Sequence, residues 1–114
     1  MKLEKRMYVR TKNGMIAKII DKRDVSGSLH REEIVFILDN GNKLALHSQK
    51  VVKASHNIID LIEVGDYING EKVILKNDGY IEIGTTNDYI GFNNEELVKS
   101  IVTKEQFESM SYKL

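Results

Sequence analysis

The sequence contains no cysteine and no tryptophan, and only 7% of its 114 residues are aromatic. Without cysteine, neither a disulfide nor a thiolate metal site can stabilise the fold. The core must therefore come mainly from Ile, Val and Leu, among the 41% of residues that are hydrophobic. A chain of this length and composition supports one core of ordinary size. We therefore predict a single domain over residues 1–114.

Long apolar runs are also missing. No run approaches the roughly 18 residues that a membrane-spanning helix requires. The opening segment MKLEKR lacks the continuous apolar stretch of a secretion signal. Together with the absence of cysteine, this predicts a cytoplasmic protein that does not enter a membrane.

Motifs that carry catalysis or bind metal are lacking as well. There is no Walker loop, dinucleotide fingerprint or Gly-x-Ser-x-Gly elbow. The three histidines, His30, His47 and His56, have no second ligand at a metal-binding spacing. The acidic pairs at 32–33 and 95–96 are neighbours in sequence, and neighbours on a strand point to opposite faces. We therefore predict no catalytic residue, no metal and no cofactor, and a non-enzymatic protein.

What the sequence does contain is a set of turn signals between apolar segments. Four Asn-Gly or Asp-Gly pairs occur, at 13–14, 40–41, 69–70 and 78–79. Asn, Asp and Gly best tolerate the positive φ angles of a type I′ turn, so each pair marks a hairpin tip. Strands are expected at 5–11, 15–21, 33–38, 43–47, 51–55, 71–76, 80–85 and 100–103. The fold class is mainly β: a small antiparallel barrel or strongly bent sheet of SH3-like type.

Two short helical elements complete this fold. Ser55 or Asn57 can cap a single helical turn at residues 58–62. Thr103 and Gln106 have the spacing of a capping box for a short helix that runs to Met110. The sequence Val-Gly-Asp at 64–66 is frequent at strand entries in small barrels, where Asp can bond to nearby backbone amides. The segment 22–31 is expected to be a loop, and 111–114 could return as an edge strand.

Some strands have more apolar residues than one barrel interior needs. The segments 15–20 and 34–38 leave little room for a polar face, so both faces are expected to be covered. The end helices can provide the second cover, or a second copy of the chain can do so. We expect a homo-oligomer in the second case.

Charge is balanced overall but uneven along the chain. Residues 1–54 hold 12 Lys or Arg and 6 Asp or Glu, whereas residues 55–114 hold 5 and 11, so the halves are formally +6 and −6. Interleaved strands would neutralise this difference on one mixed surface. Alternatively the molecule is dipolar, and a basic face attracts a phosphate-bearing ligand or an acidic face of another copy. Overall neutrality argues against general DNA binding.

Two groups of residues are candidates for ligand binding. Tyr8, Arg10 and Lys12 alternate along one strand face and offer a stacking ring beside two cations, which suits a nucleotide or phosphate. The same residues also fit an ordinary solvated strand face. The second group consists of polar residues in irregular segments, where specific contacts are often made; its members are Ser55, His56, Asn87 and Tyr89.

Three blocks of the sequence resemble a family of small phage and prophage proteins of low-GC Gram-positive bacteria. The blocks are MYVRTKNG at 7–14, KASHNIIDLIEVGDYING at 53–70 and SIVTKEQFE at 100–108. They occur in matching order and cover much of the chain, whereas residues 1–6 and 77–94 depart from them. The family is functionally uncharacterised, so the resemblance implies an origin in a mobile element and a location in the host cytoplasm. It assigns no site residue.

Three classes of function remain as hypotheses, of which a structural or virion-associated interaction protein is the last. The first is a phage accessory protein that counters host defence by sequestering a small nucleotide signal or by blocking a host defence protein. The second is a small nucleic-acid-binding or regulatory β module, because small barrels often bind single strands through aromatic and basic residues. The sequence favours a small nucleotide or a host defence protein over nucleic acid as the partner.

Overall fold

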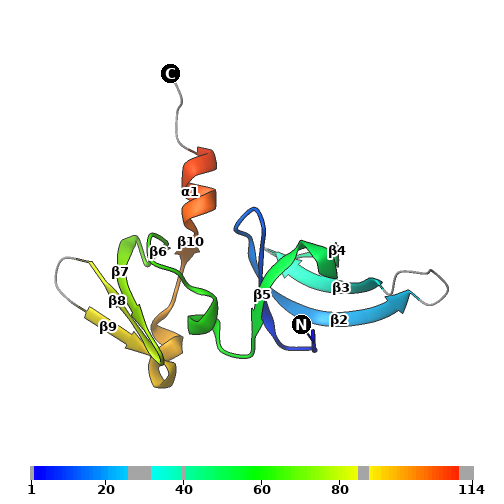
Figure 1. The fold of residues 1–114 in the computed structure, drawn as a ribbon, viewed down its shortest axis with the longest axis horizontal. Coiled ribbons are helices and arrows are strands. Elements are labelled where there is room, and N and C mark those ends of the chain that lie inside the picture. The colour runs from blue at the N-terminus through cyan, green and yellow to red at the C-terminus, as the bar shows by residue number, and fades with distance from the viewer. Residues whose placement is uncertain (1, 26–31, 40, 85–87, 111–114) are drawn as a thin grey trace. The chain divides into compact units, whose positions relative to one another are not determined.

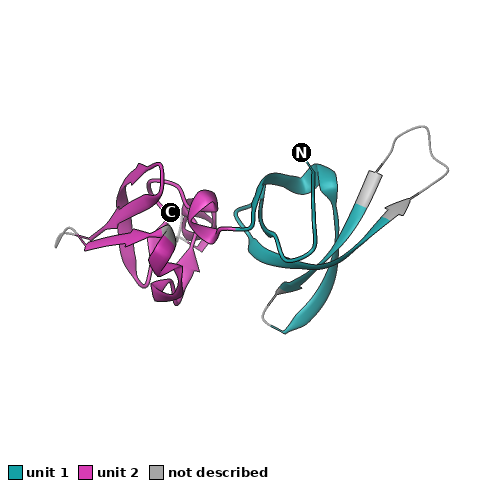
Figure 2. Ribbon diagram, turned by 90° about the horizontal axis from the view of Figure 1, so that it is seen from below, with its two compact units in different colours: residues 1–56 teal, residues 57–114 magenta. Residues whose placement is uncertain are grey.

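The computed structural model describes residues 2–25, 32–39, 41–84 and 88–110, and within these ranges the chain is mainly β. It divides into two compact units, unit 1 (Met1–His56) and unit 2 (Asn57–Leu114), coloured separately in Figure 2. Each unit contains one five-stranded antiparallel arrangement and its own buried apolar cluster. The sequence predicted one core in a single domain over 1–114, whereas two smaller cores are present.

Unit 1 is a sheet with the strand order β4-β3-β2-β1-β5 (Figure 1). A 3-10 turn, η1, separates its last two strands in sequence. The elements are β1 (Tyr8–Thr11), β2 (Ile16–Val25), β3 (Glu32–Asp39), β4 (Asn42–His47), η1 (Ser48–Lys50) and β5 (Val51–Ser55). Strand β1 therefore occupies an interior position, between β2 and β5.

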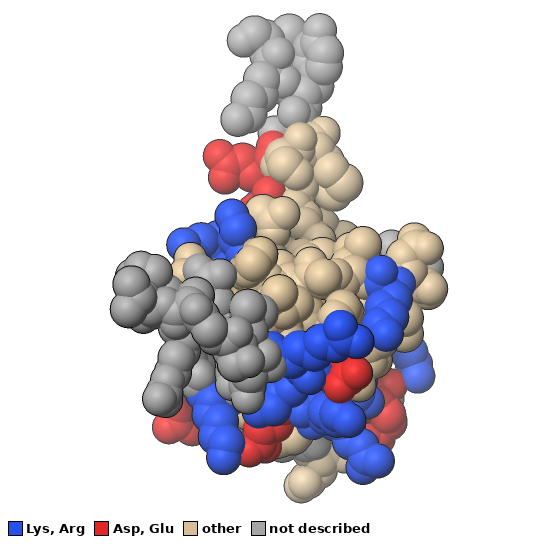
Figure 3. Space-filling model, turned by 90° about the vertical axis from the view of Figure 1, so that its right-hand side faces the viewer, with Lys and Arg blue, Asp and Glu red and all other residues tan. Residues whose placement is uncertain are grey.

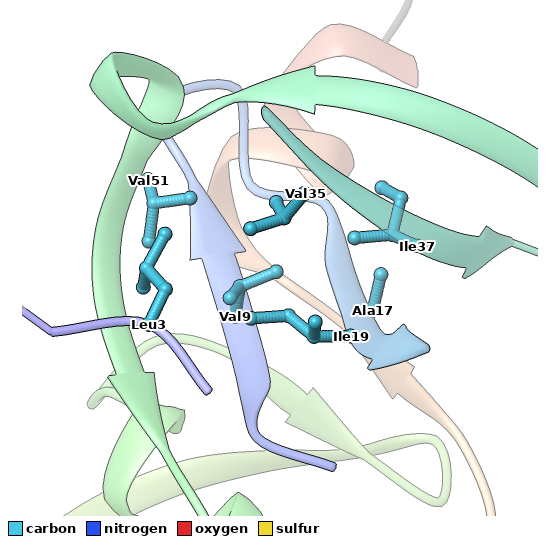
Figure 4. Packing of buried hydrophobic residues seen from close by; sticks show 7 residues of the cluster. All are labelled: Leu3, Val9, Ala17, Ile19, Val35, Ile37 and Val51. Carbon is cyan, nitrogen blue, oxygen red and sulfur yellow. The ribbon is translucent and has the colours of Figure 1, made fainter. Parts of the chain in front are cut away.

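The core of unit 1 is built from short aliphatic side chains. They come from the N-terminal segment and from strands β1, β2, β3 and β5, and they point toward one another (Figure 4). The cluster consists of Leu3, Val9, Ala17, Ile19, Val35, Ile37 and Val51. Direct pairing of Val9 with Ala17 and of Ile19 with Ile37 places these residues on one face of the sheet.

Unit 2 has the strand order β10-β6-β7-β8-β9. Its elements are η2 (Ile58–Leu61), β6 (Tyr67–Ile68), β7 (Glu71–Asn77), β8 (Tyr80–Ile83), β9 (Asp88–Gly91), η3 (Phe92–Leu97), β10 (Ile101–Val102) and α1 (Lys104–Met110). Its buried cluster is almost entirely isoleucine: Ile59, Ile62, Ile68, Val73, Ile81, Ile83 and Ile90.

The glycine pairs lie where the sequence predicts hairpins. They connect β1 to β2, β3 to β4, β6 to β7 and β7 to β8, all of which are antiparallel neighbours. Positive φ at both central residues, as in a type I′ turn, occurs at Asn69 (53°) and Gly70 (81°). At Asn13-Gly14 and Asp78-Gly79 only the glycine has positive φ. Residue 40 lies outside the described residues.

Both predicted helical elements are present, with the predicted caps. The side-chain oxygen of Asn57 accepts a hydrogen bond from the Ile59 amide at 3.1 Å and so begins η2. At α1, the Gln106 side chain accepts from the Thr103 amide at 3.1 Å, and the Thr103 hydroxyl accepts from the Gln106 amide at 3.3 Å. This reciprocal pair is a capping box. The predicted edge strand at 111–114 lies outside the described residues.

Strand alternation does not by itself settle which apolar residues are buried. Alternation from the buried Val73 predicts an inward Leu75, but Leu75 is 41% exposed, because a register irregularity between Val73 and Leu75 places it opposite Glu82. The segments 15–20 and 34–38 were expected to be covered on both faces, by end helices or by a second copy of the chain. In the single chain Ile20 and Leu38 are 39% and 47% exposed, so for these two residues a second copy remains the predicted cover.

Asp66 joins the strand entry of unit 2 to its C-terminal helix. The residue is fully buried. Its carboxylate accepts one hydrogen bond from the Glu63 amide at 2.7 Å and another from the Lys104 amide, at the start of α1, at 2.9 Å. Its backbone carbonyl also accepts from the Val73 amide at 2.8 Å. The prediction that this Asp bonds to backbone amides is confirmed, and the amide of Lys104 ties it to a segment distant in sequence.

The substitution Asp66→Ala should therefore destabilise unit 2. It removes two charge-assisted hydrogen bonds and leaves two amides without their acceptor, which lowers the free energy of unfolding by about 3 kcal/mol. Urea denaturation followed by amide NMR signals of unit 2 measures the change. Glu96→Ala, which removes the same charge from an exposed position of this unit, should change it by less than about 0.5 kcal/mol. Equal effects of the two substitutions would contradict the structural role of Asp66.

Candidate nucleic-acid interface

The outer face of the unit 1 sheet, opposite the core, carries a row of directly paired residues that crosses all five strands. Pairs of directly opposed residues point to the same side of a sheet. The pairs are Lys43 with Leu38, Leu38 with Lys18, Lys18 with Tyr8, and Tyr8 with Ser55. The row therefore reads Lys43, Leu38, Lys18, Tyr8, Ser55. We call this surface, together with Phe36 and Arg23, the outer face.

Two aromatic rings on the outer face lie beneath cations. The half-buried Phe36 ring has the Arg23 guanidinium 5.4 Å and the Lys43 ammonium 4.9 Å from its centroid. The Lys18 ammonium lies 5.5 Å from the centroid of the Tyr8 ring. These distances fall within the range of cation–π attraction. The outer face thus places cations over a ring on β3 and over a ring on β1.

The uneven charge of the chain coincides with the division into units. The basic half of the sequence was counted to residue 54, whereas unit 1 ends at His56. The two added residues are Ser and His, so the numbers of Lys, Arg, Asp and Glu do not change, and the formal charges are +6 for unit 1 and −6 for unit 2. Lys and Arg side chains gather over the lower part of the surface in Figure 3, with Asp and Glu side chains among them. The two compact units therefore carry opposite net charges, although both signs occur on this surface.

The three residues predicted on the first strand have different environments. Tyr8 is half-buried and lies on the outer face. Arg10 is only 1% exposed, which contradicts the solvated position predicted for it. It lies on the interior strand between Ile16 of β2 and Lys53 of β5, and its side chain is enclosed by protein instead of facing solvent. Lys12 is exposed and follows β1 in the turn toward β2.

Lys12 lines a cavity of about 330 Å³ at the end of unit 1. The lining residues come from the turn between β1 and β2, from β4 and from η1, and they are Thr11, Lys12, Asn13, Met15, Leu46 and Lys50. The backbone amide of Lys12 donates to the Lys50 carbonyl at 3.1 Å, which joins the two walls. Met15 and Leu46 pack against the unit 1 core and provide apolar lining.

The second predicted group does not form one site. Ser55 is part of the outer face through its pairing with Tyr8. The His56 imidazole lies 3.1 Å from the Glu4 carboxylate, with 57% and 45% of the two side chains exposed. Tyr89 belongs to unit 2, is 58% exposed and contacts Tyr80 edge to face at a centroid distance of 5.5 Å. Asn87 lies outside the described residues.

Sequence reasoning missed Lys18, Arg23, Phe36, Lys43 and Lys50. The alternation of Lys18 with Ala17 and Ile19, and of Phe36 with Val35 and Ile37, is a period-two pattern that assigns Lys18 and Phe36 to the outer face. The pairing of β2 with β3 and β4, which brings Arg23 and Lys43 to the same ring, carries no such signal in a single sequence.

Two classes of feature are absent from the described part of the chain. No group of three or more His, Cys, Asp or Glu side chains is placed to hold a metal ion. None of the helices formed by the described residues combines the length and apolar character needed to cross a bilayer.

The contact between His56 and Glu4 makes a measurable prediction. The hydrogen bond from His56 lowers the pKa of the Glu4 carboxyl below its ordinary value, assisted by the positive charge of Lys2. Because the folded-state pKa is lowered, this contact stabilises the fold above the unfolded-state pKa, and its contribution is lost as the pH falls through the folded-state pKa. NMR titration of the Glu4 side chain should show its pKa rising in His56→Ala. An unchanged Glu4 pKa in that variant would contradict the contact.

Comparison of the chain with protein-family models, curated proteins and solved structures gave no match.

Proposed function

We propose that the protein is a non-enzymatic binding protein whose outer face binds single-stranded nucleic acid. The observation that carries this proposal is the outer face of unit 1, where Lys18 lies over the Tyr8 ring and where Arg23 and Lys43 lie over the Phe36 ring. Single strands are bound by such combinations, because bases stack on aromatic rings while cations follow the phosphates.

The charge distribution supports the same ligand. A formal charge of +6 in unit 1 attracts a polyanion, and the neutrality of the whole chain arises from unit 2. Among the described residues, Lys18, Arg23 and Lys43 lie over aromatic rings and form no ion pair with a carboxylate.

The exposed apolar residues of the outer face fit a single strand better than a duplex. Leu38 is 47% exposed beside Lys18 and Lys43, and Phe36 is half-buried. Unpaired bases present flat apolar surfaces that can cover these side chains, whereas a duplex presents mainly phosphates and base edges. A preference for single strands over duplex of equal length is part of the proposal.

The test measures binding of the full chain to a fluorescein-labelled oligothymidylate by fluorescence anisotropy. Affinity should fall steeply with salt, with a slope of about −0.7 per phosphate contacted. Lys18→Gln combined with Lys43→Gln should weaken binding and reduce this slope. The matched control, Lys72→Gln combined with Lys99→Gln, makes the same charge change at exposed positions of unit 2 and should leave the slope almost unchanged. No binding at low salt, or equal effects of the two double variants, would overturn the proposal.

A second test addresses stacking. Phe36→Leu keeps an apolar side chain but removes the ring, and it should weaken oligothymidylate binding by about 1–3 kcal/mol. Phe107→Leu is the control, because Phe107 is a half-exposed ring that stacks on Tyr67 in unit 2 at a centroid distance of 4.8 Å. Circular dichroism checks that both variants fold. If the Phe36 variant binds oligothymidylate as tightly as the Phe107 variant does, the proposal that a base stacks on Phe36 is wrong.

The biological use of this binding rests on different evidence. The resemblance to small phage and prophage proteins supports an accessory role in countering host defence, by sequestering a nucleotide signal or blocking a host defence protein. Self-association is also proposed, because Ile20, Leu38, Leu44 and Val52 of unit 1 remain 39–47% exposed. Light scattering of the full chain decides this second point, since a monomer at all concentrations would exclude it.

A further inference from the structure

We infer that the cavity at the end of unit 1 is a second binding site, and that its ligand is a small phosphate-bearing molecule with a flat apolar body, such as a nucleoside monophosphate. This site is separate from the proposed stacking surface: its lining includes none of the residues that define the outer face. It therefore goes beyond nucleic-acid binding and does not depend on it.

The residues that line the cavity include both apolar and basic side chains. Met15 and Leu46 are continuous with the core of unit 1 and give it an apolar floor. Lys12 and Lys50 also line the cavity and are exposed, so their flexible side chains can bring two ammonium groups to an anion held there. Within the described residues, neither ammonium group has a carboxylate partner. Such a lining favours a ligand that is apolar at one end and anionic at the other.

The walls of the cavity are held in place before any ligand binds. The Thr11 hydroxyl donates to the Asn13 side-chain oxygen and accepts from the Met15 amide at 3.0 Å. The Thr11 amide donates to the Met15 carbonyl at 3.0 Å, and the Lys12 amide donates to the Lys50 carbonyl at 3.1 Å. A preformed site spends less of its binding free energy on ordering loops.

The Asn13 side chain adds a donor to this site. Since its oxygen already accepts from Thr11, the amide nitrogen is the group that remains for an anionic ligand. Together with the exposed side chains of the two lysines, it can offer a ligand three nitrogen donors beside the apolar floor. The cavity volume of about 330 Å³ lies near the lower end of the roughly 300–1,000 Å³ typical of small-molecule sites, which suits a mononucleotide better than a larger cofactor.

The test uses AMP, adenosine and inorganic phosphate as probes of the full chain, with binding followed by amide NMR shifts. AMP should shift signals from residues 11–15 and 46–50. Adenosine lacks the anion, and inorganic phosphate lacks the apolar body, so each should bind at least about tenfold more weakly than AMP. AMP binding elsewhere, or inorganic phosphate binding as tightly as AMP, would overturn the inference.

Variants separate this site from the outer face. Lys12→Gln combined with Lys50→Gln should weaken AMP binding at least about tenfold, whereas Lys72→Gln combined with Lys99→Gln, with the same charge change in unit 2, should not. Phe36→Leu should leave AMP binding intact even though it weakens oligothymidylate binding. If the Lys12 and Lys50 double variant binds AMP like the wild-type chain, the cavity is not the site. AMP binding lost in Phe36→Leu would mean that AMP occupies the outer face instead.

Discussion

Strand alternation around a small aliphatic core is the constraint on which the rest of unit 1 depends. With no disulfide and few aromatic residues, the unit buries seven aliphatic side chains on one face of its sheet. Because successive residues of a strand point to opposite faces, burying Val35 and Ile37 places Phe36 on the other side. The same geometry pairs Lys18 with Tyr8 when Ala17 pairs with Val9. The aromatic and basic outer face is thus a geometric consequence of the way the core is built.

Much of the fold was predictable because it depends on local sequence. The hairpins follow from Asn-Gly and Asp-Gly pairs, and η2 and α1 follow from caps that lie within three residues of the groups they bind. Asp66 was assigned correctly to backbone amides because it follows Gly65 at a strand entry. Each of these features is determined by a few neighbouring residues, so a single sequence is enough to reveal it.

The wrong predictions concern properties that depend on distant pairing. Nothing near Leu75 indicates the register irregularity that turns it outward. Arg10 has the alternation of a solvated residue, but its 1% exposure depends on tertiary packing that its neighbours in sequence do not indicate. The division after His56 was hidden for a similar reason, since a continuous series of short strands fits one barrel or two sheets equally well. For the candidate site, the sequence identified Tyr8, Lys12 and Ser55 but missed the residues that β2, β3 and β4 bring beside them.

The contacts of the cations give an argument for placing the function in unit 1. Both units contain cations with structural partners. In unit 2, Lys104 pairs with Glu63 at 2.7 Å and Lys76 donates to the Asp60 carbonyl at 2.9 Å, and in unit 1, Lys22 donates to the Leu3 carbonyl at 3.1 Å. The buried carboxylate of unit 2, Asp66, holds the start of α1. These contacts give the charged side chains involved a role in stabilising the fold.

A second set of unit 1 cations has different contacts. Lys18, Arg23 and Lys43 lie over aromatic rings, and Lys12 and Lys50 line a cavity. Cations in these positions add little to stability, because exposed cation–π contacts contribute only about 0.5–1 kcal/mol each. A concentration of positive charge in one compact unit also raises its self-repulsion. The fold itself gives little reason for that concentration, whereas an anionic ligand would neutralise it, so the excess charge of unit 1 is better explained by binding than by folding.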